Sequence, residues 1–251
     1  MHTADKESTV IKLCLVLSVI AFFVAINLSP SQAIAEETDC GLENVKVEFS
    51  AQKDAEIACE GVRRALNFFA AYGFSEFQHV HIIILDHVIS ETGVENEGNK
   101  ESNIFCAFYN RIANHSVITS CETALAEQRM IFGSIPNTHE YHRSIVAHEV
   151  AHNLYHQIFE AMGKEVERPL TEFVSYVVQI ETLDEPEKLQ VLELWPHKTF
   201  RSIYQINSLS WVMNPNLFGI MSYRYHRENP SFIKSILAGE IISGDKLIPA
   251  Q

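Results

Sequence analysis

The stretch of sequence that decides the fold is NTHEYHRSIVAHEVAHNLYHQIFEAMG, residues 137–163. Apolar residues recur through it at helical spacing, which predicts one long helix that begins at Asn137 and ends near Met162, before Gly163. Glu140 follows Asn137 at the spacing of a capping box. Because apolar residues occupy much of the circumference, we expect this helix to be buried.

This helix contains the sequence His148-Glu149-Val150-Ala151-His152, an HExxH motif. The spacing places both imidazoles on one helix face, one turn apart, where they can chelate one ion. Glu149 points about 100° around the helix from His148, close enough to hold a water molecule on that ion. Imidazole and carboxylate ligands suit zinc, so the motif predicts a zinc site.

The other histidines on this helix are weaker candidates. The metzincin class of zinc proteins is excluded, because Tyr155 and Ile158 stand where that class has Gly and His. His156 drifts about 80° off the face of the first motif histidine, and we expect it to be solvated or to lie behind the ligands. His139 and His142, in the first turns, are expected to be solvated.

A catalytic zinc ion needs a third protein ligand and one open position. We predict that this ligand is Glu172, which lies 20 positions after His152. Glu172 stands at the start of a helix that Pro169 opens, where the helix dipole favours a carboxylate. Glu165 and Glu167, in the connection before this helix, remain alternatives.

The HEVAH motif, a gap of 19 residues and then Glu172 resemble the gluzincin metallopeptidases, the thermolysin-like and aminopeptidase-like clan. Residues 170–176, LTEFVSY, look like the glutamate helix of that family. The order of elements is similar to small peptidase-MA-like domains, over about residues 59–183. The resemblance implies a zincin-like fold, zinc bound by His148, His152 and Glu172, and Glu149 as the general base.

The chain departs from the family pattern at two points. Thermolysin-like enzymes have an Asp that orients the first zinc-binding His, and Tyr176 stands at that position here. The orienting carboxylate therefore comes from elsewhere or is absent. The family also uses a Tyr or His to stabilise the oxyanion. Tyr223 and His226 are the candidates here, although the position that aligns with the family's Tyr is near Phe218.

The rest of the chain indicates an α+β fold in one domain, residues 36–251. We expect a small mixed sheet with a hairpin that packs on the HExxH helix and the following glutamate helix. Periodicity and turn residues predict helices at 54–72, 170–183 and 186–195, a central strand at 80–85 (VHIIIL), a hairpin of 105–110 with 116–120, and late apolar stretches at 217–225 and 232–237.

Residues 1–35 read as a secretory signal peptide. An apolar run at residues 13–28 precedes Ala33-Ile34-Ala35, a small-x-small cleavage pattern. The run is shorter than the roughly 20 residues that a spanning helix needs. A secreted or periplasmic protein with no stable membrane insertion follows, and an uncleaved N-terminal anchor is the alternative, since Asp5 and Glu7 dilute the basic leader.

The segment after residue 35 contains four cysteines, an even number that can form two disulfides. Disulfides form in oxidising compartments outside the cytosol, so the cysteines agree with an exported protein. We favour the pairs Cys40–Cys59 and Cys106–Cys121, the second of which brackets the hairpin; four free thiols are the alternative. Asn114-His115-Ser116 is a glycosylation sequon, which short sequences often contain by chance.

Composition limits the classes of molecule that the protein is expected to bind. The chain has 19 basic and 32 acidic residues and a net charge of −13, which repels nucleic acid. We therefore predict an exported zinc-dependent metallopeptidase, whose partner is a peptide or protein substrate added as a strand at the edge of the hairpin. The alternative is a zinc-stabilised peptide- or protein-binding domain that has lost proteolysis.

Overall fold

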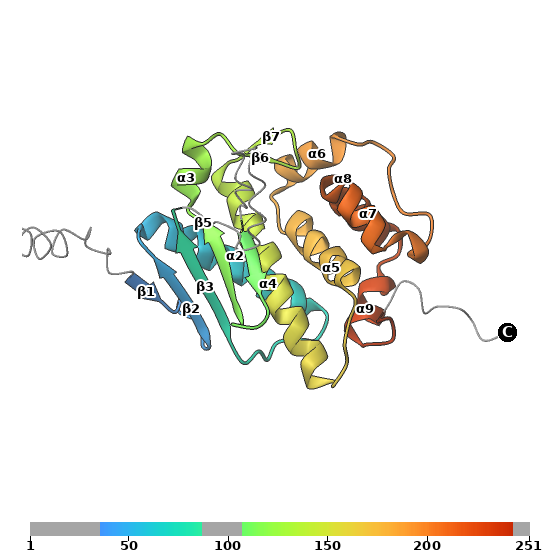
Figure 1. The fold of residues 1–251 in the computed structure, drawn as a ribbon, viewed down its shortest axis with the longest axis horizontal. Coiled ribbons are helices and arrows are strands. Elements are labelled where there is room, and N and C mark those ends of the chain that lie inside the picture. The colour runs from blue at the N-terminus through green and yellow to red at the C-terminus, as the bar shows by residue number, and fades with distance from the viewer. Residues whose placement is uncertain (1–35, 87–106, 243–251) are drawn as a thin grey trace, which may run out of the picture. The chain divides into compact units, whose positions relative to one another are not determined.

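A five-stranded mixed sheet and a stack of helices make up residues 36–86 and 107–242, the part of the chain that the computed structural model describes (Figure 1). The predicted α+β class and small mixed sheet are confirmed. The five strands are β1 (Glu36–Thr38), β2 (Val45–Phe49), β3 (Val80–Leu85), β4 (Ala107–Asn110) and β5 (His115–Thr119), in the order β1-β2-β3-β5-β4.

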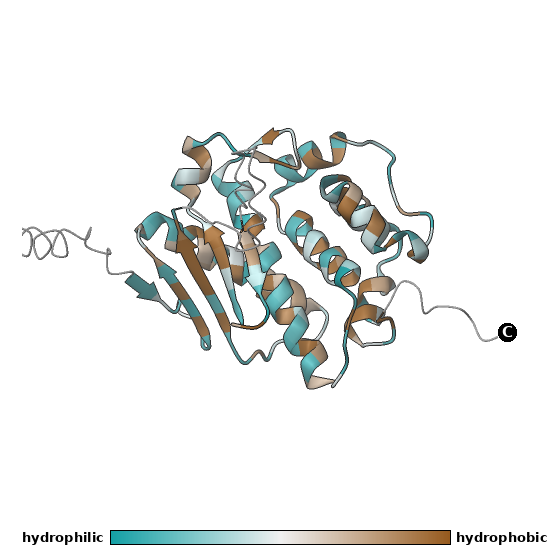
Figure 2. Cartoon of the chain, in the orientation of Figure 1, coloured by the Kyte–Doolittle hydropathy of each residue, from teal (hydrophilic) through white to brown (hydrophobic). Residues whose placement is uncertain are grey.

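Strand β3 is the centre of the sheet, as the VHIIIL run predicts. It pairs in parallel with β2 and β5, whereas β1 and β4 are antiparallel edge strands. Figure 2 shows β3 and β5 mostly in brown and β1 in teal, which fits their central and edge positions. The predicted hairpin is therefore confirmed as β4–β5, except that residues 105 and 106 lie outside the described residues.

The helices cover one face of the sheet and then one another. Helices α2 and α4 pack on the sheet, α5 packs on α4, and α8 packs on α5, away from the sheet (Figure 1). The helical elements are α2 (Gln52–Ala71), α3 (Cys121–Ala126), α4 (His139–Ala161), α5 (Arg168–Glu181), α6 (Glu185–Glu193), the 3₁₀ turn η1 (Ile203–Gln205), α7 (Ser208–Met213), α8 (Pro215–Glu228) and α9 (Ser231–Leu237).

Helix α4 lies in the middle of this stack and is buried nearly all round, as its apolar circumference predicts. It contacts β4 and β5, so the hairpin packs on the HExxH helix. On another side α2 approaches closely at Gly61, where a Cβ would come within 2.7 Å of the carbonyl oxygen of Arg143 and of Val146 Cβ. A side chain at that position would force the two helices apart.

The start of α4 corrects one sequence prediction. The N-cap is Thr138, whose hydroxyl accepts a hydrogen bond from the backbone N–H of Tyr141, rather than Asn137. The backbone N–H of Asn137 instead donates a hydrogen bond to the carbonyl of Arg129, which extends the short β6–β7 hairpin (Met130–Ile131 and Ile135–Pro136). His142 is a second correction, because it is 3% exposed instead of solvated.

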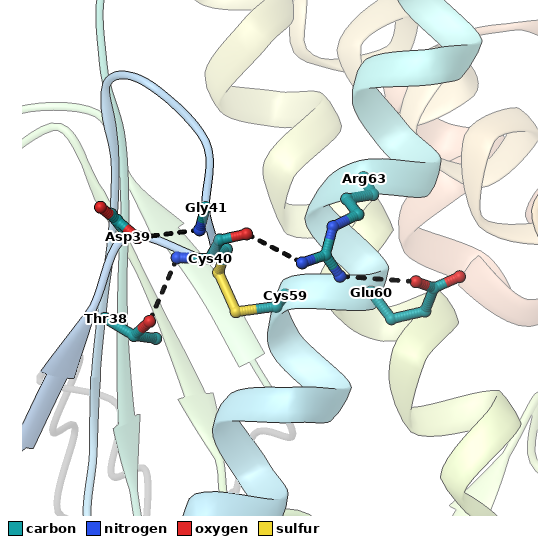
Figure 3. Close-up of a disulfide and its surroundings, with 7 residues drawn as sticks. All are labelled: Thr38, Asp39, Cys40, Gly41, Cys59, Glu60 and Arg63. Atoms are coloured by element: carbon teal, nitrogen blue, oxygen red, sulfur yellow. Dashed lines mark hydrogen bonds and ion pairs between the residues drawn. A yellow bond between two sulfur atoms is a disulfide. The ribbon is translucent and has the colours of Figure 1, made fainter.

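A disulfide joins Cys40, in the turn between β1 and β2, to Cys59 on α2, as predicted (Figure 3). Arg63 donates a hydrogen bond to the carbonyl of Cys40, which ties the same turn to the same helix. Closing a loop of this size stabilises the fold by about 3 kcal/mol in the chain-entropy view. Cys121 is a buried free thiol, and its predicted partner Cys106 lies outside the described residues.

Two further predictions concern the chain's export. The predicted signal peptide, residues 1–35, lies outside the described residues, and no helix within 36–86 or 107–242 is long and apolar enough to cross a membrane. The sequon residue Asn114 has an engaged side chain, whose oxygen accepts hydrogen bonds from Tyr109 and Asn153. These bonds tie the hairpin turn to α4.

Candidate metal centre

Helices α4 and α5 bring His148, His152 and Glu172 together. One ligand atom from each residue lies within 4.8 Å of the others. The two histidine Nε2 atoms are 3.1 Å apart, and each is 3.7 Å from Glu172 Oε2. Among the described residues this is the one group of three or more His, Cys, Asp or Glu side chains that could hold a metal ion.

The donor set fits zinc. Two imidazole nitrogens and one carboxylate oxygen are the ligands of many catalytic zinc sites, which keep a fourth position open. Glu165 and Glu167, the alternative third ligands, do not belong to the cluster, and neither does His156. His156 stacks instead on Tyr109, with ring centroids 5.4 Å apart.

The residue that orients the first histidine is Gln179. His148 Nδ1 donates a hydrogen bond to Gln179 Oε1 over 3.0 Å, which leaves Nε2 free to face the cluster. The group that orients this histidine is therefore an amide oxygen and not a carboxylate. Gln179 lies seven positions after Glu172, two turns further along α5, so both side chains share the face toward α4. A polar residue two turns after Glu172, on the same helix face, was the available sequence signal.

Two aromatic rings hold the histidines from the outside. The Tyr176 ring meets the His148 ring edge to face, with centroids 4.7 Å apart. Tyr109, on β4, stacks parallel to His152 at 6.5 Å. Tyr176 thus contacts His148 through its aromatic ring and not through a hydrogen bond. The sequence had no signal for the role of Tyr109, which depends on where the hairpin lies.

Burial and the neighbouring charges together set the pKa values in the cluster. Burial raises the pKa of the Glu149 carboxyl to about 7, with the Glu172 charge acting in the same direction and His148 opposing both. Burial also lowers the pKa of His152 to about 3, which keeps its nitrogen unprotonated and able to bind a metal. For Glu172, burial is outweighed by the nearby His148 and His152, and the pKa falls to about 2.

A cleft of about 190 Å³ opens beside the cluster. His148 and Glu149 both line it, so the glutamate that is not a ligand shares this cleft with one ligand of the cluster. Its wall carries both apolar and polar side chains, and the polar ones other than His148 and Glu149 are neutral. The other lining residues are Ala107, Met130, Ile131, Phe132, Ile145, Tyr176, Gln179 and Asn216.

The structure does not bring Tyr223 and His226 to this cleft. His226 lies against Tyr72 of α2, with His226 Nε2 3.5 Å from the tyrosine oxygen. The hydroxyl of Tyr223 pairs with Arg227 and Glu181. The reason is position along α8: Tyr223 and His226 are seven and ten residues beyond Asn216, which lines the cleft, and this places them about 10 and 15 Å further along the axis.

The fold and the site together define an α+β protein with a buried His-His-Glu cluster that can hold a metal ion. The chain belongs to the DUF6639 family of unknown function, which matches residues 45–245 and so includes both helices of the cluster. No curated protein and no solved structure is significantly similar to the chain.

Proposed function

We propose that the protein is an exported zinc-dependent peptidase. One observation carries the proposal: three ligand atoms converge within 4.8 Å, and Glu149, which the cluster does not use, lines one cleft together with the ligand His148. A site that served only to stabilise the fold would be closed, whereas this one has an open side and an acid–base group beside it. Zinc held by His148, His152 and Glu172 would supply Lewis-acid chemistry, acidifying water and polarising a carbonyl.

The chain's own residues then move the protons. Glu149 takes a proton from the attacking water onto its carboxylate and later gives that proton to the leaving amine. Gln179 holds His148 in the tautomer whose Nε2 faces the ligand cluster. Burial of the cluster excludes bulk water from these groups, which strengthens every charge interaction among them.

The surroundings of the cleft support a peptide substrate. Strand β4 is the edge of the sheet, and Ala107 at its start lines the cleft. An extended peptide can pair with such an edge through its backbone. Met130, Ile131 and Phe132 form an apolar wall, which favours a large apolar side chain next to the scissile bond. The disulfide supports the proposed export.

The test is a set of measurements on one purified protein. We expect one zinc per chain by elemental analysis, and hydrolysis of a chromogenic peptide pool that a chelator abolishes and zinc restores. Glu149→Gln is nearly isosteric and should keep the zinc and the melting temperature while activity falls about 10²–10⁴-fold. Full activity in this variant would refute the mechanism. Stoichiometric zinc without chelator-sensitive hydrolysis in the parent would favour the zinc-stabilised binding domain instead.

A further inference from the structure

Adding hydroxide to a peptide carbonyl leaves a negative charge on the carbonyl oxygen, and hydrogen-bond donors fixed in advance around that oxygen stabilise it. The described residues that line the cleft include no Lys or Arg. The donors must therefore be neutral groups. Gln179 is held through its oxygen by His148, and we consider the two neutral donors on the wall that are not tied to a ligand in this way, Tyr176 and Asn216.

Tyr176 is held rigidly beside the metal cluster. One side of its ring packs on His148 of α4. The other side packs on Gly219 of α8, where a Cβ would come within 2.5 Å of a ring carbon. A tyrosine hydroxyl carries its proton at neutral pH and can donate it in a hydrogen bond.

Asn216 approaches from α8. It lies three residues before Gly219, so the two share the helix face that packs toward Tyr176. On its other side, the Asn216 amide packs against Gly133 in the β6–β7 turn. A Cβ at Gly133 would lie only 3.1 Å from Asn216 Nδ2, so the close contact depends on this residue being a glycine. Asn214, two residues earlier, already caps α8 through its oxygen, so Asn216 is not needed for that purpose.

Both donors are free to act on a ligand. Within residues 36–86 and 107–242, neither the Tyr176 hydroxyl nor the Asn216 side-chain amide makes a hydrogen bond. A partly enclosed hydroxyl and a partly enclosed amide that face one small cleft without partners are groups that a bound molecule would satisfy.

We propose that the Tyr176 hydroxyl and the Asn216 amide hydrogen-bond the oxyanion formed on the scissile carbonyl, an assignment that rests on the proposed peptidase function. In this step the water oxygen forms a bond to the carbonyl carbon, the water proton passes to Glu149, and the π electrons move to the carbonyl oxygen. The two donors face that oxygen. When the tetrahedral intermediate collapses, the C–N bond breaks and Glu149 returns the proton to the amine.

The test compares Tyr176→Phe and Asn216→Ala with matched controls. Tyr225→Phe removes another hydroxyl that lies outside the cleft, and Asn67→Ala removes another amide, on the exposed side of α2. We expect kcat to fall about 10²–10³-fold for Tyr176→Phe or Asn216→Ala, with little change in KM. Zinc content and melting temperature should stay at parental values, and both controls should hydrolyse peptide at the parental rate.

A binding measurement provides a second readout. A phosphinic peptide mimics the tetrahedral oxyanion, and calorimetry should show that its affinity falls in the same proportion as kcat in the two variants. An uncleaved peptide should bind equally to Glu149→Gln and to Glu149→Gln combined with Tyr176→Phe. Parental kcat and parental phosphinate affinity in both single variants would overturn the assignment. Loss of zinc from Tyr176→Phe would also overturn it, since the ring would then act through His148.

Different results would contradict the oxyanion assignment and the proposed peptidase function. If Glu149→Gln abolishes hydrolysis while Tyr176→Phe and Asn216→Ala leave it unchanged, only the oxyanion assignment is wrong. If the zinc-loaded parent hydrolyses no peptide, the proposed function is wrong and the oxyanion assignment is overturned with it.

Discussion

Two buried glutamates on neighbouring helices have opposite surroundings. Glu140, in the first turn of α4, is 6% exposed and is matched by protein cations. Arg64 and Arg143 both pair with its carboxylate, and the backbone N–H of Asp184 donates to it over 2.9 Å. This group is a complete structural ion pair, because its charge is satisfied by cations that the chain itself supplies.

Glu172, on α5, is 7% exposed and is matched mainly by two histidines. Each of them places a nitrogen 3.7 Å from its carboxylate, beyond good hydrogen-bond distance. The one arginine nearby, Arg168, lies 3.5 Å away and has a side chain that is 72% exposed. Three acceptor atoms that converge without a buried cation between them indicate that the cation comes from outside the chain.

The largest effect on stability should come from Glu140. Glu140→Ala leaves Arg64 and Arg143 partly buried without their main partner, and we expect a loss of about 3–5 kcal/mol in the free energy of unfolding. Urea denaturation measures it. Glu60 is another partner of Arg64, and the Glu60 side chain is 40% exposed. Glu60→Ala should therefore cost at most about 1 kcal/mol. Zinc content should be unchanged in both variants, and equal costs would contradict the comparison.

Glu172→Gln should act on metal binding instead. Mutating residues that only orient a zinc ligand costs about 10–100-fold in affinity, so losing a charged ligand should cost more than about 100-fold. Competition with a fluorescent zinc chelator measures the affinity. Glu165→Gln is the control, because Glu165 lies outside the cluster and should bind zinc like the parent. The opposite result for these two variants would mean that the third ligand has been misassigned.

A third buried side chain, His142, is expected to make stability depend on pH. Burial lowers its pKa to about 4, and the nearby Arg129 and His139 act in the same direction. The unfolded chain binds a proton below its ordinary pKa of about 6.5, whereas the folded protein does not bind one until about 4. Stability should therefore be full above about pH 6.5 and should fall by about 3 kcal/mol as pH drops toward 4.

His142→Gln tests this dependence. Urea unfolding at a series of pH values should show a shallower fall in stability for the variant than for the parent between about pH 6.5 and 4.5. Asn137 donates to His142 Nδ1 over 3.3 Å, so some constant loss of stability is expected at all pH values. If the parent and the variant give parallel curves, His142 is not the titrating group.

The smallest effect should come from Gln179, which touches no metal. Gln179→Ala removes the acceptor for His148 Nδ1, and zinc affinity should fall about 10–100-fold because the ring loses its fixed tautomer. Gln179→Glu replaces the amide oxygen with a charged carboxylate oxygen, which also accepts the hydrogen bond, and this variant should bind zinc at least as tightly as the parent. A zinc affinity unaffected by either change would mean that packing by Tyr176 alone holds the ring.

Local sequence pattern was enough to predict the helices and the central strand that surround the site. Strand β3 matches its predicted bounds, and the predicted helices appear with ends shifted by a few residues. The shift at α4 has a clear cause. Asn137 and Thr138 are both good N-cap residues, and the choice between them depends on Asn137 being held by the β6–β7 hairpin, which local sequence does not show.

The residues at the centre of the site follow from local sequence pattern. Spacing within one helix places His148 next to His152, and the helix that begins at Arg168 offers Glu172 just after its first turn, so these three need little beyond helix geometry and one contact between α4 and α5.

The residues around that centre come together through the packing of segments that are far apart in sequence. Gln179, Tyr176 and Asn216 reach the cleft because α5 and α8 pack in one particular register, and Tyr223 misses it by two turns of the same helix. Helix periodicity repeats every turn and identifies a face, whereas the position along the face that meets a neighbour depends on side-chain packing between segments far apart in sequence.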